Sequence, residues 1–433
     1  MTYNIKLEKG KKYIIYIAYC FASSYPIVQL YKEYNPLFIC AEDPIDAPKN
    51  NFISIQGELI SLGMGANLVN FAKVIVKSKR ITDLFNSLKK HQGEVWVKIF
   101  ENTLAFKELF NKPYVKSLGL SSEQANLLNN KLYQYELLKD VIPIPEFVIT
   151  KKENAVEHFE KLNIGNGVFT HLARGGGGDG VRIHNDKASL KKYLIKINDE
   201  KIIMVQAFDV KISPSIDILI ANKDEIFVFG LADQIFDGLK CLGATYPSVL
   251  PPHVKAKCYD ITYKVAKKIA QSGIKGYISM DIIVDKNNNV YFCELNARYA
   301  GTTHNRMLAM EQVRPPNSPS IIDLEVMAIK EGTFNRHKLW DEPKEIFWYK
   351  KEIFPEFNGT IEQLSRGNNS LELYKKGKGF VIVGQRRIGT VFIKNKTSLG
   401  NLICVEKTRK KLEKSIIHSN TIIKKYIGSQ LTK

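Results

Sequence analysis

Strand-length and helix-length signals alternate along the first 120 residues, and this rhythm restricts the fold more than any other feature of the sequence. Four short apolar runs are separated by two segments with the spacing of amphipathic helices; the runs are 13–21, 36–40, 52–55 and 94–100, and the helical segments are 24–34 and 66–91. Chains that alternate in this way bury their strands in a parallel sheet with helices against its faces. We therefore predict a small doubly wound α/β domain over residues 1–125.

Residues 126–332 mix helices with hairpins, which predicts an α+β domain. Helices are expected at 121–139, 153–163, 255–272 and 321–331, and strands at 146–150 and 167–172. We expect strand 202–208 to pair with 216–221, while the sequence does not identify the partner of strand 225–231. Strands 277–284 and 290–295 are predicted to form a hairpin, because the turn residues between them tolerate left-handed conformations.

The pattern of apolar and charged residues changes beyond residue 333. Strands are expected at 380–383 and 389–393, and residues 404–433 carry eight basic and two acidic residues. We predict a small, mostly β C-terminal domain over 333–433 with a basic helical tail, whose role as lid, dimer contact or substrate platform the sequence leaves open.

The charge of the chain is strongly basic, with 63 Lys and Arg against 44 Asp and Glu, or +19. Most of these cations are lysines, whereas proteins that bind the phosphate backbone and base edges of nucleic acids use more arginine. We therefore disfavour a nucleic-acid partner and expect small anionic ligands.

The cysteines and the apolar segments indicate a cytoplasmic protein. The six cysteines are widely spaced and form no CxxC pair, as expected for reduced thiols. The apolar run at 13–22 is short, is interrupted by tyrosines and follows ten residues that include Glu8, which favours a buried strand over a signal peptide. No run is long enough to span a bilayer, so no membrane partner is expected.

A glycine-rich segment, Leu172–Arg182, carries the first chemical signal. Five of the six residues 175–180 are glycine, and they follow a predicted strand. Such a loop can close its backbone N–H groups over phosphate oxygens because no side chains intervene. No Gly-Lys-Ser/Thr follows, so this is not a Walker loop. A phosphate cradle and an ordinary hairpin tip both remain open from the loop alone.

The predicted hairpin carries the second signal. Glu294, Asn296 and Arg298 lie in phase on one strand, and Asp281 can lie opposite them on the other. Two carboxylates and an amide oxygen on one face suit Mg²⁺, and an arginine there can bind a phosphate. Polar alternation on an exposed sheet is the alternative, but the flanking residues are apolar, which favours a half-buried sheet with inward polar groups.

Together these motifs resemble the ATP-grasp superfamily over residues 126–312. The glycine loop is followed by an Asp, then a Glu thirteen positions on and an Asn two further (281, 294, 296). The resemblance implies two α+β subdomains that hold ATP between them, with Mg²⁺ or Mn²⁺ bound by Asp281, Glu294 and Asn296. It also implies that a carboxylate attacks the γ-phosphate to give an acylphosphate, from which an amine, or sometimes a thiol, then displaces phosphate.

The resemblance carries further residues over to the nucleotide. Lys131 would contact a phosphate, and the segment 204–208 would contact adenine through its backbone; the implied nucleotide-binding residues are Lys131, His171, Arg174, Gly175, Gly176, Gly177, Gly178, Gly180, Gln206, Ala207 and Phe208. Arg298 would be catalytic, facing the transferred phosphoryl group.

Two residues depart from the family pattern. His171 stands where the family usually has lysine, so it either touches nucleotide or is a buried strand histidine, and Arg174 or Arg182 could supply the missing charge. Gln206 stands where glutamate is common, so the expectation of ATP over GTP rests on the family alone.

Within the superfamily, three segments resemble pheganomycin-type peptide ligases and related amino acid–carrier protein ligases; these are 233–238, 243–247 and 295–304. The resemblance implies an ATP- and Mg²⁺-dependent carboxylate–amine ligase acting on an amino acid or peptide. His304 and Arg306 would contact substrate, with packing and a structural salt bridge as the respective alternatives.

Two rival functions stay open. A carboxylate–thiol ligase would use the same site to load an amino acid onto an acidic carrier protein, which the basic surface would suit. A non-catalytic nucleotide- or nucleic-acid-binding protein belongs to another class. The sequence does not decide whether the chain forms a homodimer.

Overall fold

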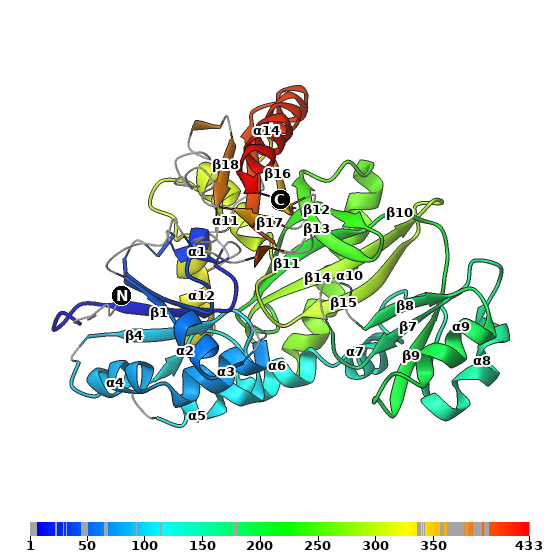
Figure 1. Ribbon diagram of the computed structural model, residues 1–433, viewed down its shortest axis with the longest axis horizontal. Coiled ribbons are helices and arrows are strands. Elements are labelled where there is room, and N and C mark those ends of the chain that lie inside the picture. The colour runs from blue at the N-terminus through cyan, green and yellow to red at the C-terminus, as the bar shows by residue number, and fades with distance from the viewer. Residues whose placement is uncertain are drawn as a thin grey trace.

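The chain is described by a computed structural model that covers most of the sequence (Figure 1). The described residues are 7–21, 24–28, 30–31, 33–44, 51–64, 68–91, 93–112, 115–175, 178, 180–335, 339, 341, 343–355, 359–361, 376–377, 380–383, 392–393 and 398–432. Within these ranges, no helix combines the length and the apolar character that crossing a lipid bilayer requires.

The N-terminal region is a five-stranded parallel sheet, as predicted. Its strands lie in the order β3-β2-β1-β4-β5, with bounds β1 Tyr13–Ala18, β2 Asn35–Cys40, β3 Phe52–Ser54, β4 Val95–Ile99 and β5 Lys116–Ser117. One face packs against α2 (Gln56–Ser61), α3 (Leu68–Lys77) and α4 (Lys79–Leu88). The other face packs against α11 (Thr303–Val313) and α12 (Ile321–Lys330), which come from much later in the chain. This second contact fixes the N-terminal sheet to the rest of the molecule.

The short helices of this region differ from the prediction in extent. The helix expected over 24–34 is limited to α1 (Tyr25–Val28), and the remaining short elements are η1 (Leu104–Phe106) and α5 (Lys107–Phe110). The single helix expected over 121–139 is two helices, α6 (Ser122–Leu128) and α7 (Lys131–Leu138). The break between them matters for the site described below.

A four-stranded antiparallel sheet follows, at the opposite end of the molecule from the N-terminal sheet (Figure 1). Its order is β6-β9-β7-β8, with bounds β6 Phe147–Lys151, β7 Val168–Leu172, β8 Val181–His184 and β9 Lys201–Gln206. Helices α8 (Ala155–Leu162) and α9 (Lys187–Leu194) pack on it, and η2 (Lys152–Asn154) precedes α8. The predicted pairing of 202–208 with 216–221 was wrong, because β9 pairs with β6 and β7 instead.

The central element is a nine-stranded sheet. Its path is β10-β14-β11-β12-β13-β16-β20-β18, and β15 pairs with β14 beside this path. The strands from the middle of the chain are β10 Val210–Ile212, β11 Pro214–Ile220, β12 Ile226–Asp237, β13 Lys240–Tyr246, β14 Gly276–Asp285 and β15 Val290–Asn296. Helix α10 (Pro252–Ala270) buries its apolar side against this sheet. Strand β12, whose partner the sequence left open, pairs with both β11 and β13.

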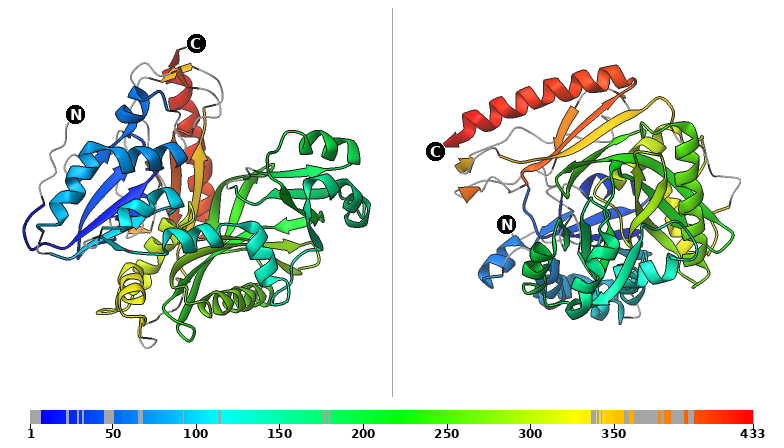
Figure 2. Two further views of the ribbon diagram at one scale, coloured as in Figure 1. Left: turned by 90° about the horizontal axis from the view of Figure 1, so that it is seen from below. Right: turned by 90° about the vertical axis from the view of Figure 1, so that its right-hand side faces the viewer.

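Three strands of the C-terminal region extend the central sheet. Strand β16 (Phe347–Ile353) pairs with β13, and β20 (Gly400–Glu406) joins β16 to β18 (Phe380–Val383). Helix α14 (Arg409–Gln430) runs along these strands (Figure 2), and β17 (Gly359–Ile361), β19 (Phe392–Ile393) and β21 (Leu431–Thr432) form a small sheet beside them. Of the strand expected at 389–393, residues 389–391 lie outside the described residues.

Candidate functional site

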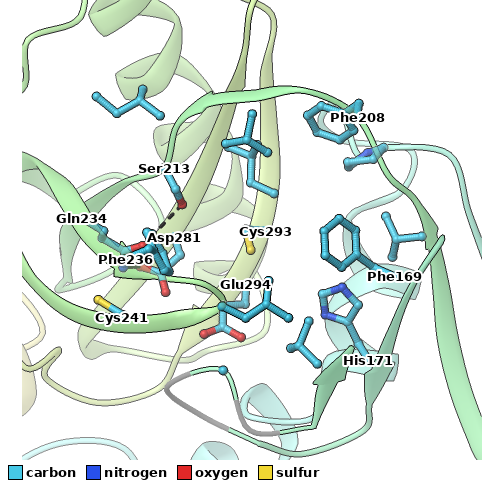
Figure 3. A pocket seen from close by; sticks show the side chains of 18 of the residues that line it. Phe169, His171, Phe208, Ser213, Gln234, Phe236, Cys241, Asp281, Cys293 and Glu294 are labelled. Carbon is cyan, nitrogen blue, oxygen red and sulfur yellow. Dashed lines mark hydrogen bonds between the residues drawn. The ribbon is translucent and has the colours of Figure 1, made fainter. Parts of the chain in front are cut away.

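A deep pocket lies between the four-stranded sheet and the central sheet. Its volume is about 480 Å³. Phe169, His171 and Phe208 face Cys293 and Glu294 across it (Figure 3). Most of its wall is apolar, with a few polar groups gathered at one side. This combination is typical of a pocket that binds and orients a small organic ligand.

The polar side of the pocket is built on the hairpin of β14 and β15. Asp281 pairs directly with Glu294, and Ser279 pairs with Asn296, so the acidic and amide side chains share one face, as the sequence predicted. The Asn296 side-chain Nδ2 lies 3.2 Å from Asp281 Oδ2 and 3.5 Å from Glu294 Oε1. Gln234 on β12 donates to Asp281 Oδ1 at 2.8 Å. The three predicted metal ligands therefore lie within reach of one another.

The two carboxylates differ in their protonation. Burial, and then the charge of Glu294, raises the pKa of Asp281 to about 7. Burial alone would raise the pKa of Glu294 too, but the Lys131 ammonium, which forms an ion pair with its Oε2, outweighs burial and holds that pKa below its ordinary value. Within the described residues no cation forms an ion pair with Asp281, so a bound divalent ion would stabilise its charge.

The ligand set fits Mg²⁺ better than a metal that needs a full protein cage. Within the described residues, no group of three or more His, Cys, Asp and Glu side chains converges. Two carboxylates and one amide leave coordination positions for water and phosphate oxygens, which Mg²⁺ prefers. A half-turn of the Asn296 amide would exchange its Nδ2 for Oδ1, the atom that can bind a cation.

Helix α7 positions Lys131, and the break before this helix explains how. Asn130 caps α7 by accepting from the backbone of Leu132, and the Lys131 N–H donates to Ala173 O at 2.9 Å. The Lys131 ammonium donates to Gly175 O at 3.1 Å, although its side chain is only 5% exposed. Lys131 therefore links the acidic hairpin to the start of the glycine loop.

The described part of the glycine loop bends over the pocket. Gly178 lines the pocket with φ +91°, and a Cβ there would lie 2.4 Å from Leu239 O in the β12–β13 turn. Gly180 has φ +78° and lies against the Leu172 side chain. Both positions require glycine, because a side chain would be strained and would displace its neighbours. Gly176 and Gly177 lie outside the described residues.

Neither nearby arginine lines the pocket. Arg174 donates to Asn126 O at 3.0 Å from an exposed position, and Arg182 donates to the neighbouring Val181 O. The structure gives no support to a compensating charge from Arg182 or to a pocket role for Arg174 in this arrangement.

His171 does line the pocket, and within the described residues its Nδ1 has no hydrogen-bond partner. Burial, and then the charge of Lys131, lowers the pKa of His171 to about 4, so the ring is neutral at pH 7. A buried polar atom without a partner is costly, and a ligand in the pocket would supply one.

The segment after β9 forms the far wall. Gln206 and Phe208 line the pocket, and the Phe208 ring lies 5.2 Å from that of Tyr291. The N–H groups of Gln206 and Ala207 are already used by Glu146 O and Gly167 O. Ala207 is buried and does not line the pocket. Any backbone contact to a ligand here must therefore use the remaining groups of this segment.

Arg298, His304 and Arg306 lie outside the lining of this pocket. Arg298 follows β15 and faces the N-terminal domain, with Nε 3.4 Å from Glu101 Oε2, although its charge still lowers the pKa of Asp281. His304 is completely buried on α11.

The substrate role expected for Arg306 needs correction. Its guanidinium is paired with Asp217 at 2.9 Å, and neither side chain is exposed. Ser215 also accepts from Arg306, and Tyr277 and Ser279 donate to Asp217. This network engages both terminal nitrogens of Arg306, and among the described residues only its buried Nε has no partner, which favours the structural salt bridge over a substrate contact.

Sequence reasoning did not single out five polar or thiol residues of the pocket, Lys211, Ser213, Gln234, Cys241 and Cys293. Gln234 is the informative omission, because its side chain reaches Asp281. The signal was present, but its meaning depends on β12 lying in the same sheet as β14.

Comparison with known proteins agrees with this geometry. A model of the ATP-grasp domain matches residues 128–302. Among solved structures, a biotin carboxylase of Campylobacter jejuni in complex with β-γ-ATP is 16% identical, with a TM-score of 0.70 over 97% of this chain and 94% of that one.

Two enzymes of another activity are similar in fold as well. The N5-carboxyaminoimidazole synthase of Aspergillus clavatus, solved with ADP and 5-aminoimidazole ribonucleotide, is 13% identical, with a TM-score of 0.64 over 96% of this chain and 99% of that one. The corresponding synthetase of Staphylococcus aureus, solved with ADP, is 15% identical, with a TM-score of 0.62 over 97% and 100%. At these identities the likeness concerns the fold. The domain match shows an ATP-grasp domain over residues 128–302, and the structural likeness extends the fold of these enzymes over nearly all of the chain.

Proposed function

We propose that the chain is an ATP- and Mg²⁺-dependent ligase that joins a carboxylate to an amine through an acylphosphate, with an amino acid or peptide as substrate. One observation carries the proposal: Asp281 and Glu294 meet on paired strands beside Lys131, at the polar side of a pocket of about 480 Å³. Mn²⁺ could replace Mg²⁺ at these oxygen ligands.

The proposed roles follow from the positions. The apolar wall with Phe208 takes the base, His171 offers a neutral hydrogen-bonding nitrogen, and Lys131 and the glycine loop meet the phosphates. Asp281, Glu294 and Asn296 hold Mg²⁺, which when bound neutralises phosphate charge during transfer. Arg298 stabilises the phosphoryl group from the side of the N-terminal domain. No protein nucleophile is needed, because the substrate carboxylate attacks the γ-phosphorus directly.

Closing the glycine loop over this pocket would exclude water, which otherwise hydrolyses an acylphosphate. Gly178 already lies against the β12–β13 turn, and this contact supports a closed arrangement of the loop. ATP is proposed over GTP on the habit of the superfamily.

Bicarbonate is a further candidate for the carboxylate that attacks ATP. The similar biotin carboxylase and carboxyaminoimidazole synthase folds extend over 96–97% of this chain, so the C-terminal strands are part of the likeness. A thiol acceptor on a carrier protein uses the same chemistry and is the second candidate acceptor. We also propose a cytoplasmic location and a homodimer.

The test is a screen for substrate-stimulated release of phosphate from ATP, with amino acids, short peptides and bicarbonate as donors and product masses read directly. Asp281→Asn and Glu294→Gln should abolish release while both variants remain folded and unfold cooperatively on heating. Asp260→Asn, an exposed carboxylate on α10, is the matched control and should retain activity. ATP turnover that survives in both site variants would refute the assignment, and a complete lack of ATP binding would favour a different function.

A further inference from the structure

A second, smaller pocket lies at the carboxyl ends of β1 and β4. Its volume is about 80 Å³, and its wall is mainly apolar, with Ile17, Tyr19, Leu68, Phe71 and Phe106 among the lining residues. In the strand order β3-β2-β1-β4-β5, β2 and β3 are added on one side of β1, and β4 and β5 on the other. The topological switch point of this parallel sheet therefore lies between β1 and β4. Ligands of open parallel sheets bind in the crevice at such a reversal.

The volume of this pocket limits what can enter it. An engineered apolar cavity of about 150 Å³ accepts benzene, and a water molecule occupies about 30 Å³. A pocket of about 80 Å³ therefore suits a branched aliphatic group and is too small for an indole ring.

The edge of the small pocket carries a pair of opposite charges. Glu101 lines the pocket, and its Oε2 lies 3.4 Å from Nε of Arg298. The two side chains are 34% and 18% exposed, so a ligand can reach both. Arg298 comes two positions after the metal ligand Asn296, which places the charged edge between the small pocket and the acidic hairpin. A carboxylate and a guanidinium side by side match the ammonium and carboxylate of a zwitterion.

A buried lysine from the C-terminal region adds a third charge. Lys350 on β16 is 3% exposed, its ammonium donates to Gly301 O at 2.7 Å, and within the described residues no carboxylate lies within ion-pairing distance of it. Burial lowers its pKa, whereas the charge of the nearby Glu352 carboxylate, and then that of the small-pocket residue Cys20, acts to raise it. Lysines are almost never buried without a partner.

Strand pairing places Lys350 on the reaction face of the central sheet. Lys350 pairs with Ala244, which pairs with Gln234, the residue that donates to Asp281. Residues paired across neighbouring strands point to the same face. The Lys350 ammonium, which has no ion pair within the described residues, thus lies on the same side of the sheet as the metal ligands, where an anionic ligand would stabilise it.

We propose that the junction of these three features binds an aliphatic α-amino acid as a zwitterion. Its side chain enters the small pocket, its ammonium faces Glu101, and its carboxylate faces Lys350 and Arg298. This inference rests on the proposed function, because it names the class of substrate that the proposed ligase would bind. It also assigns a role to the C-terminal strands, since β16 supplies Lys350 to the site.

Calorimetric titration of the full chain in Mg²⁺ and ADP tests this, with L-leucine, 4-methylpentanoate, 3-methylbutylamine and L-tryptophan as probes. Leucine should bind about tenfold or more tightly than 4-methylpentanoate, which lacks the ammonium, or the amine, which lacks the carboxylate. Tryptophan should not compete. Leucine and tryptophan binding equally well, or no binding of leucine, would overturn the proposal.

Two variants with matched controls separate the charged contacts. Glu101→Gln should weaken leucine about tenfold and leave 4-methylpentanoate unchanged, whereas Lys350→Met should weaken both and leave 3-methylbutylamine unchanged. Glu108→Gln on exposed α5 and Lys351→Met, which faces the other side of β16, are the controls and should bind leucine normally.

Equal losses for every probe in these variants would indicate a merely structural role and contradict the proposal. ADP binding is measured in the same titrations. If ADP binds and leucine does not, the amino-acid site is wrong and the ligase proposal stands; if ADP does not bind, the ligase proposal itself fails.

Discussion

The ion pair between Lys131 and Glu294 allows the effect of the site on ATP turnover to be measured separately from its effect on the stability of the fold. Glu294 is 18% exposed and Lys131 only 5%, so Lys131→Met leaves a largely buried carboxylate without its cation. Removing one partner of such a pair costs about 3 kcal/mol of unfolding free energy. Glu294→Gln should cost less, because Lys131 keeps its hydrogen bond to Gly175 O.

The double variant Lys131→Met/Glu294→Gln should recover stability to within about 1 kcal/mol of the unaltered protein, because no uncompensated charge remains. Its ATP turnover should nevertheless stay absent, since both a phosphate contact and a metal ligand are gone. Urea unfolding followed by tryptophan fluorescence gives the first quantity, and ADP release gives the second.

The exposed pair of Lys139 and Glu136 on α7 is the control. These side chains are 45% and 55% exposed, so Lys139→Met should change stability by less than about 0.5 kcal/mol. A double variant as unstable as Lys131→Met alone, or one with restored turnover, would refute this reasoning.

Three further predictions follow from the same geometry. Arg306→Met should destabilise the protein by about 3–5 kcal/mol by leaving Asp217 buried and unpaired, and a stable variant with only a raised KM would instead return Arg306 to a substrate role. Gly178→Ala should weaken ATP binding in equilibrium dialysis, because its Cβ meets Leu239 O and its φ is positive, whereas Gly57→Ala, with open space around it, should not. His171→Ala should weaken ATP binding about 2- to 10-fold, equally at pH 6 and pH 8, because a ring with a pKa of about 4 is neutral at both; unchanged affinity would remove His171 from the nucleotide site.

The acidic hairpin could be predicted from the sequence because the residues that determine its pairing lie close together in the chain. Alternating side chains and a short Asn-rich turn fix which residues of 277–284 and 290–295 face each other, and Asp281 does pair with Glu294. The parallel N-terminal sheet followed from the same kind of local rhythm.

Pairings between distant strands could not be predicted in this way. Strands β9 and β11 are neighbours in sequence but belong to different sheets, so the expected pairing between them failed. The joining of β16 to β13 depends on residues about 100 positions apart, and the position of Lys350 depends on that joining. Arg306 looked like a carboxylate clamp because its partner, Asp217, lies on a strand far away in the chain. The domain boundaries at 125/126 and 332/333 stay predictions.

The most direct measurement is a crystal structure grown with Mn²⁺ and ADP, read by its anomalous difference map. We expect a manganese peak between Asp281 and Glu294, with the nucleotide running from the Phe208 wall toward Lys131. A manganese peak elsewhere in the presence of bound ADP, or an occupied pocket with both carboxylates turned away from the ion, would contradict it.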